Sequence, residues 1–195
     1  MRRHGNPPGW VTARIAAPGR RSADAANCVD LLAGAFAAPA AYAEGVVFLV
    51  RHAEKSLEVA GDEAPLLAAG IDRARTLARM LADDGIAELI TTDALRSRQT
   101  GAPFAERSGL KPQVMTRDGQ VAFAGRLREK PDGRDRLMVG HTRNIPRILD
   151  ALGVPGGGQV RLNAEVDYDH MFVVQMYPDR PPSMVRLRFE VADRD

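Results

Sequence analysis

The sequence predicts an α/β domain built around a mostly parallel sheet. Two observations lead to this class: short apolar runs alternate with amphipathic stretches from residue 45 onward, and the first apolar run carries no polar residue. That run, VVFLV at 46–50, is rich in β-branched and aromatic residues, as expected for a strand buried on both faces. With 195 residues and 45% hydrophobic content, the chain suits one folded domain with a full core.

The remaining helices and strands are expected in alternation along the chain. Apolar residues at steps of three and four predict a helix over 71–81, which Gly85 follows as a stop. The further expected elements are a strand at 86–92, a helix at 96–107 closed by Gly109, an edge strand at 110–115, a weak helix at 121–130, a strand at 136–140, a helix at 145–152 and strands at 171–177 and 185–191. The glycines at 156–158 lack the Lys and Ser/Thr of a phosphate-binding loop and are predicted to form a flexible loop.

Charge and cysteine content exclude several classes of function. The formal net charge of +2 comes from residues 1–44, which hold five arginines and three acidic residues, whereas the other 22 basic and 22 acidic residues balance. A domain without basic excess is not expected to neutralise many phosphates, so no nucleic-acid partner is predicted. The single cysteine, Cys28, excludes an internal disulfide, and four histidines without an HxH or HExxH pattern do not predict a metal site.

Residues 1–44 differ in composition from the domain expected at 45–195. The stretch 31–43 carries no charge; it is too short to span a bilayer but suits the apolar region of a signal peptide, and it ends in Ala-Tyr-Ala. These features predict an exported protein, periplasmic or secreted, without a stable membrane span. Asp24 and Asp30 precede the apolar run, where signal peptides are usually uncharged or basic. The alternatives are a disordered Ala-rich arm, with a cytoplasmic protein, or a start site placed too far upstream.

Histidine and arginine residues follow three of the predicted strands. Arg51 and His52 end the first strand, His141 ends the strand at 136–140, and Arg96 starts the helix after the strand at 86–92. Because ligands of open α/β sheets bind outside the carboxyl ends of the strands, these four side chains are expected to converge. Guanidinium and imidazole N–H groups bind phosphate oxygens, so the pattern predicts an electropositive site for a phosphoryl group.

Four motifs then resemble, in order, those of the histidine phosphatase superfamily, which has the phosphoglycerate mutase-like fold. RHAEK at 51–55 resembles the family's RHG or RHA. LLAAG at 66–70, followed by RA at 73–74 and LA at 77–78, resembles the family's L(S/T)xxGxxQA. TDALRSRQT at 92–100 resembles SxxxR(A/T)xQT, and VGHTRNIP at 139–146 resembles VGHxxxIP. The segment 168–174 is similar to the closing strand of short members. The resemblance implies a three-layer α/β/α architecture with a mostly parallel central sheet.

The resemblance also implies a mechanism. His52 would be the nucleophile, whose neutral imidazole attacks phosphorus to give a phosphohistidine that water then hydrolyses. Arg51, Arg96 and His141 would bind the phosphoryl oxygens and stabilise the transition state, with no metal ion or other cofactor. The nearby cations would lower the pKa of His52. The expected protein is a phosphatase acting on a phosphomonoester or phosphoramidate, carried by a small molecule or a phosphoprotein.

No motif identifies the acid that would protonate a leaving alkoxide. Asp118 is favoured because it follows a predicted strand end, and the other candidates are Glu106, Glu129, Asp132 and Asp135. Short phosphohistidine phosphatases lack this acid, since a phosphoramidate leaving group differs from an alkoxide. Glu54 and Lys55 either line the rim of the pocket or pair with each other.

Two other functions are alternatives to the phosphatase. A phosphoglycerate mutase would need insertions and a glutamate motif that are not found in the sequence. A catalytically silent phosphate- or phosphopeptide-binding module would be expected to lose His52 or His141, and both are present. The 44 positions from His52 to Arg96, and the 45 from there to His141, leave little room for cap insertions. This spacing predicts an open site, and with it broad or protein-sized substrates.

Overall fold

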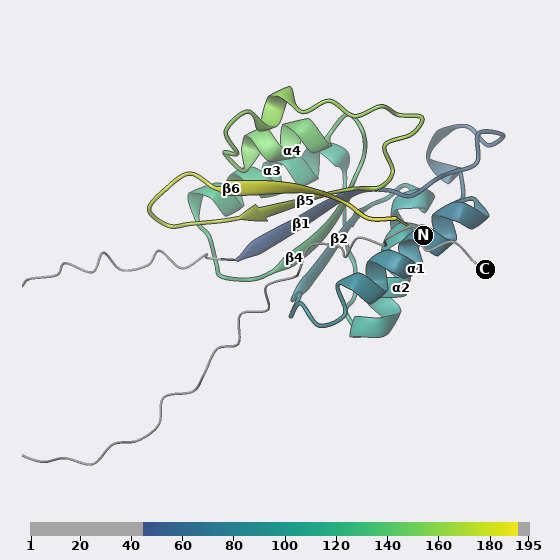
Figure 1. Cartoon of the computed structure of the whole chain (residues 1–195), viewed down its shortest axis with the longest axis horizontal. Coiled ribbons are helices and arrows are strands. Elements are labelled where there is room, and N and C mark those ends of the chain that lie inside the picture. The colour runs from purple at the N-terminus through teal and green to yellow at the C-terminus, as the bar shows by residue number, and fades with distance from the viewer. Residues whose placement is uncertain (1–44, 191–195) are drawn as a thin grey trace, which may run out of the picture. The chain divides into compact units, whose positions relative to one another are not determined.

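Six strands form the centre of the structure, a computed structural model that describes residues 45–190 (Figure 1). The strands lie in the order β3-β2-β4-β1-β5-β6; the first four of this order are parallel, while β5 is antiparallel to β1 and β6 to β5. Their bounds are β1 Val46–Arg51, β2 Glu88–Thr92, β3 Gln113–Met115, β4 Arg136–Gly140, β5 His170–Gln175 and β6 Ser183–Arg188. The predicted signal peptide lies outside the described residues and stays a prediction.

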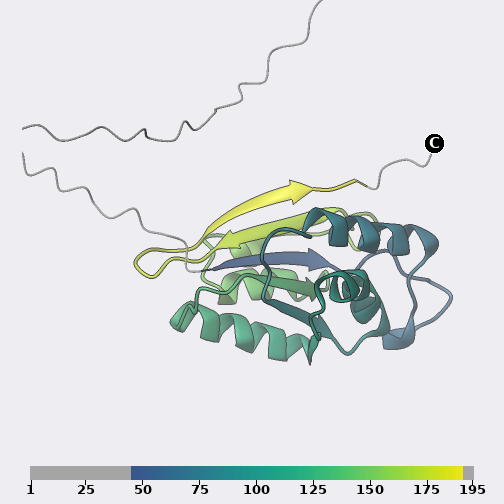
Figure 2. The same cartoon turned by 90° about the horizontal axis from the view of Figure 1, so that it is seen from below.

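Helices cover both faces of this sheet, which confirms the predicted three layers. One pair packs on one face and the second pair on the other (Figure 1), and β6 forms the outer edge beside β5 (Figure 2). The α-helices are α1 Ala68–Met80, α2 Leu95–Ser108, α3 Arg117–Glu129 and α4 Ile145–Ala151. Two short 3-10 helices, η1 Gly61–Glu63 and η2 Gly157–Gln159, lie in the connections.

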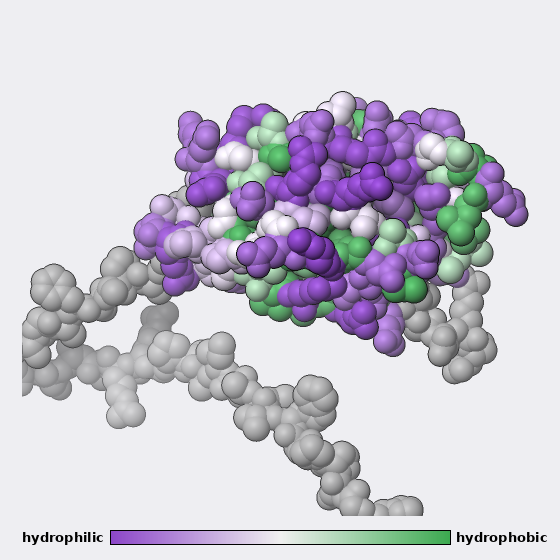
Figure 3. Space-filling view, turned by 90° about the horizontal axis from the view of Figure 1, so that it is seen from above, coloured by the Kyte–Doolittle hydropathy of each residue, from purple (hydrophilic) through white to green (hydrophobic). Residues whose placement is uncertain are grey.

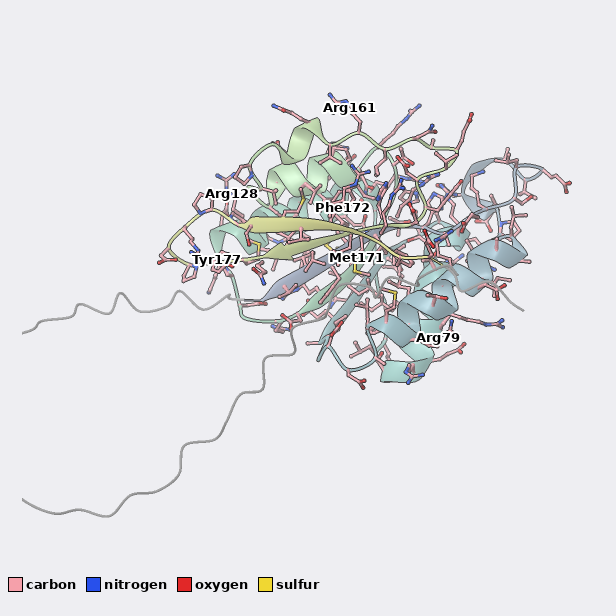
Figure 4. The ribbon with its side chains drawn as sticks, viewed as in Figure 1. Arg79, Arg128, Arg161, Met171, Phe172 and Tyr177 are labelled. Atoms are coloured by element: carbon pink, nitrogen blue, oxygen red, sulfur yellow. The ribbon has the colours of Figure 1, made fainter. Side chains whose placement is uncertain are left out.

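Alternating side chains of the strands fill two cores. On β1, Val47 and Leu49 pack against α3 and α4, whereas Val50 packs against α1 and α2. On β5, the neighbours Met171 and Phe172, both labelled in Figure 4, divide between the same two cores. Because both faces are buried, the central strands are apolar along their length, as the sequence indicated.

Some element boundaries differ from the sequence prediction. Helix α3 begins at Arg117, four residues before its expected start, because the Thr116 hydroxyl caps it by accepting a hydrogen bond from the Gly119 amide at 3.0 Å. The prediction of a flexible loop at 156–158 was wrong: Gly157 is buried in η2, and a Cβ there would lie 2.8 Å from the backbone of Leu149. The loop is therefore packed against α4.

The surface of the described domain is largely hydrophilic. On the face drawn in Figure 3, apolar residues form separate small patches among polar ones. Arginines such as Arg79 and Arg161 are exposed (Figure 4). Within residues 45–190, none of the helices has the length and apolar character needed to cross a bilayer.

A glycine in α1 allows the segment after β1 to lie directly against this helix. A Cβ on Gly70 would lie 2.2 Å from the carbonyl oxygen of Glu54, which itself accepts the Leu67 amide at 2.9 Å. We expect Gly70→Ala to lower the free energy of unfolding by about 1–3 kcal/mol, because backbone must move to make room. Chemical denaturation monitored by circular dichroism measures this change.

The matched control is Gly125→Ala in α3, where no atom lies within 4 Å of the added Cβ. Alanine there should raise the free energy of unfolding by about 0.5–1 kcal/mol, since glycine is unfavourable inside a helix. Equal effects of the two substitutions would contradict the close approach at Gly70.

Candidate active site

The carboxyl ends of β1, β2 and β4 bring together three of the residues predicted from the sequence. His52 follows β1, Arg96 lies in the first turn of α2 and His141 follows β4, and their exposed fractions are 4%, 7% and 6%. The two imidazole rings lie 5.1 Å apart between centroids, and the His52 amide donates to the Gly140 carbonyl at 3.0 Å. The structure thus places these three side chains at the same edge of the sheet.

The environment of His52 fixes both its tautomer and its charge. Nδ1 lies 2.9 Å from the carbonyl oxygen of Ala53. A carbonyl only accepts hydrogen bonds, so Nδ1 carries the proton and Nε2 keeps its lone pair. Burial, with a smaller contribution from the charges of Arg51, Arg96 and Lys55, lowers the pKa of His52 to about 3. The neutral imidazole expected from the sequence thus results mainly from burial and only secondarily from neighbouring cations.

His141 is held by a chain of buried amides. Its backbone N–H donates to Asn144 Oδ1 at 2.6 Å, Asn144 Nδ2 donates to Gln120 Oε1 at 2.8 Å, and Gln120 Nε2 donates to the Val139 carbonyl at 3.1 Å. The ring atom Nε2 lies 2.8 Å from Thr92 Oγ1. Burial, followed by the charges of His52, Arg117 and Arg96, lowers the pKa of His141 to about 3.

Both predicted arginines have one guanidinium N–H without a partner. Arg96 donates from Nη1 to the Gly61 carbonyl at 3.0 Å and from Nη2 to Asp62 at 3.1 Å, but its Nε is buried with no hydrogen-bond partner. Arg51 likewise has a buried, unpartnered Nε. An unsatisfied buried donor is costly, so these two N–H groups are suited to an anionic ligand.

Arg51 also anchors the loop that precedes β5. Its Nη atoms donate to the carbonyls of Asn163, Ala164 and Asp167, at 3.2, 2.6 and 3.4 Å, and the guanidinium lies 3.8 Å from the ring centroid of Tyr168. The structure therefore gives this arginine a structural role that the sequence did not predict, while its Nε stays buried without a hydrogen-bond partner.

Hydroxyl groups of α2 connect the strands around the site. Ser97 Oγ accepts from the Thr92 amide at 2.9 Å and donates to the Val139 carbonyl at 3.2 Å. Thr100 Oγ1 accepts from the Ala53 amide at 3.0 Å and donates to the carbonyl of Arg96 at 2.7 Å. These bonds explain why the segment 92–100 carries hydroxyl residues next to its arginine.

Two charged residues enter the site without any sequence motif. Asp62 of η1 forms ion pairs with Arg96 and Arg117, the first residue of α3. The hydrogen bond from Arg117 is the main cause that lowers the pKa of Asp62. Its ionised carboxylate compensates both guanidinium groups. Arg117 also ranks before Arg96 among the cations that lower the pKa of His141.

Asp118 is not in contact with either histidine. Its side chain is 82% exposed and pairs with Arg147 at 2.7 Å. It lines a pocket of about 390 Å³ together with Asn144, the residue that binds the His141 amide. The other predicted acids lie elsewhere: Asp132 and Asp135 precede β4 at the opposite end of that strand, and Glu106 and Glu129 are exposed near the ends of α2 and α3.

Glu54 and Lys55 do not pair with each other. Glu54 forms a bidentate ion pair with Arg73, with contacts of 2.6 and 2.9 Å, and Lys55 donates to the Ser56 carbonyl at 3.1 Å. Both line a pocket of about 430 Å³ that also includes Tyr168, whose ring centroid is 6.1 Å from that of His52. Of the two alternatives, lining the rim of a pocket and pairing with each other, the structure shows the first.

One group of side chains in the described domain has the spacing of metal ligands. Asp167, Asp169 and His170 place potential ligand atoms within 4.8 Å of one another at the start of β5. Arg188 lies within 4 Å of both carboxylates, and Arg186 Nε donates to His170 Nδ1 at 3.3 Å. These guanidinium groups already compensate the acidic charge.

Comparison with known proteins shows a similarity to one family over part of the chain. The sequence model for the histidine phosphatase superfamily (branch 1) matches residues 47–119, a range that contains His52 and Arg96. No curated protein matches the chain.

Several solved structures share the fold at low sequence identity. The protein histidine phosphatase SixA complexed with tungstate is 16% identical, with a TM-score of 0.54, over 73% of this chain and 96% of that one. The alpha-ribazole phosphatase from Shigella flexneri is 14% identical, with a TM-score of 0.59, over 77% and 99%. A mycobacterial glucosyl-3-phosphoglycerate phosphatase is 15% identical, with a TM-score of 0.54, over 76% and 99%. The match over residues 47–119 and this shared fold show that the chain is similar to the histidine phosphatase superfamily.

Proposed function

We propose that the protein hydrolyses a phosphomonoester or phosphoramidate, of a small molecule or a phosphoprotein, through a phosphohistidine at His52 and without a metal ion. The observation that carries the proposal is the neutral His52, with Nδ1–H bound to the Ala53 carbonyl, beside the unpartnered Nε–H groups of Arg51 and Arg96. A nucleophile with a free lone pair and two cationic donors is the minimum that phosphoryl transfer to histidine requires.

The reaction has two displacements at phosphorus. Nε2 of His52 attacks, a P–N bond forms, and the bond from phosphorus to the leaving group breaks. Water then attacks the phosphohistidine, the P–N bond breaks, and phosphate leaves with His52 neutral again. Arg51, Arg96 and His141 stabilise the charge on the phosphoryl oxygens in both steps, and Asp62 must release Arg96 as the substrate binds.

An alkoxide leaving group also needs a proton, and we keep Asp118 as the proposed acid. Its support is the position of its side chain in the pocket that Asn144 also lines. The ion pair with Arg147 must open before the carboxyl group can act. The leaving group of a phosphoramidate or an activated aryl ester depends less on protonation by this carboxyl group.

His52→Asn should lower hydrolysis of p-nitrophenyl phosphate by about a thousandfold or more, because the nucleophile is lost. The full chain is assayed with a chelator present, and phosphorylated His52 is sought by mass spectrometry after an alkaline quench. His170→Asn is the control, since it changes another buried histidine that begins β5. Full activity of His52→Asn would refute the proposed nucleophile, and an inert wild type that binds phosphate would favour the silent binding module.

Asp118→Asn should reduce hydrolysis of glycerol phosphate by about 10²–10⁴-fold and leave p-nitrophenyl phosphate nearly unchanged, since only the alkoxide needs protonation. Steady-state kinetics on both substrates measures this difference. Asp84→Asn, an exposed change in the turn after α1, serves as the control. An equal effect on both substrates, or none on either, would show that Asp118 is not the acid.

The neutral state of His52 predicts a pH dependence of stability. Its folded pKa of about 3 lies below the ordinary 6.5, so between these values the unfolded chain binds more protons. The stabilising contribution is complete above pH 6.5 and is lost, at up to about 1.4 kcal/mol per pH unit, as the pH falls. Urea denaturation between pH 6 and 4 should therefore show a shallower loss for His52→Gln than for the wild type. Identical slopes would mean that His52 titrates normally.

A further inference from the structure

A pocket of about 430 Å³ adjoins the nucleophile and has mainly apolar walls. Its walls include Leu57, Leu67 and Ala164, and its inner side is formed by Tyr168, which lies next to the His52 ring. Lys55, three residues after the nucleophile, lines it as well. Tyr168 thus links the pocket to His52, since its ring centroid lies 6.1 Å from that of the histidine.

The charges around the pocket do not select a strongly charged ligand. The carboxylate of Glu54 is already paired with Arg73, and Lys55 donates to the backbone of its neighbour Ser56. The exposed Glu165 adds one negative charge, which balances that of Lys55. The apolar walls are thus the feature that a ligand can use.

Leu67 occupies a backbone position that normally takes a polar residue. It is the N-cap of α1, with φ −73° and ψ 168°, and its side chain supplies no capping hydrogen bond. Ser, Thr, Asp and Asn are preferred at such positions, and leucine is among the least favourable. Instead of capping the helix, the Leu67 side chain lines the pocket, where it is 48% exposed.

A second apolar side chain faces solvent at the same pocket. Leu57 is 85% exposed, the largest value among the large hydrophobic residues of the described domain. A ligand between Leu57 and Leu67 would remove apolar surface of both from water, which favours binding. The unusual exposure of Leu57 and the uncapped helix start at Leu67 therefore indicate the same kind of ligand.

We propose that this pocket binds an uncharged apolar leaving group, the size of a ring system, and that Leu57 and Leu67 determine the preference for it. The inference rests on the proposed function, because the group must be attached to the phosphoryl that His52 attacks. It also differs from the protein-sized substrates that the short spacing of the motifs predicted, since the pocket has the dimensions of a small molecule.

The test compares 2-naphthyl phosphate with phenyl phosphate, two aryl esters that differ mainly in apolar area. The wild-type full chain should show kcat/KM about tenfold higher for the naphthyl ester, a factor typical of added apolar contact in a pocket. Leu67→Ser and Leu57→Ser should each lower this ratio several-fold. Val185→Ser, which changes an exposed apolar residue on β6, is the control and should keep the ratio.

Leu67→Ser also distinguishes an effect on substrate preference from an effect on stability. Serine at the N-cap supplies the missing acceptor, so the variant should unfold at the same temperature as the wild type or higher. Loss of the naphthyl preference with unchanged thermal stability supports the pocket. A wild type that hydrolyses both esters equally, or variants that keep the preference, would overturn the inference. Failure of the proposed function is distinct, because the wild type would then hydrolyse neither ester.

Discussion

The structure of the site depends on keeping two imidazole rings out of water. His52 and His141 are each less than a tenth exposed, and this burial is the main cause of their low pKa. A buried polar group is stable only when its hydrogen bonds are satisfied, so the surroundings must supply partners. The carbonyl of Ala53 and the hydroxyl of Thr92 do so. The contact with Ala53 also leaves His52 Nε2 without a proton, which is the state that the proposed reaction requires.

The arginines supply positive charge to the site, while the two imidazole rings stay neutral. Their guanidinium groups are held by backbone carbonyls and by Asp62, contacts that fix their geometry before a ligand binds. Preorganised donors cost no rearrangement at the moment of reaction, which is the main source of electrostatic catalysis. Asp62 differs from the backbone carbonyls because its charge offsets those of Arg96 and Arg117, so under the proposed function an anionic substrate would compete with it for Arg96. This single carboxylate thus allows the positive charges of Arg96 and Arg117 to lie close together.

The sequence predicted those parts of the site that depend on local order along the chain. His52 and His141 directly follow buried strands, and the sheet alone brings such positions together. Asp62 and Gln120 were missed because their roles arise from contacts across 34 and 24 positions, with Arg96 and Asn144 respectively. A polar residue on an inward helix face was the only signal for Gln120. No local pattern could have shown that Arg51 anchors the loop before β5.

Under the proposed role of the pocket, Leu67 would serve both the start of α1 and the preference for a substrate. The segment 52–67 between β1 and α1 ends at the N-cap of α1, so Leu67 both starts the helix and lines the pocket. A polar cap would stabilise the helix by about 1 kcal/mol but would place a hydroxyl or carboxylate beside the substrate. With leucine at this position the helix start lacks that hydrogen bond, and apolar surface is exposed at the pocket. Since natural proteins give up stability mainly at functional sites, the uncapped helix start is itself a reason to look for a ligand there.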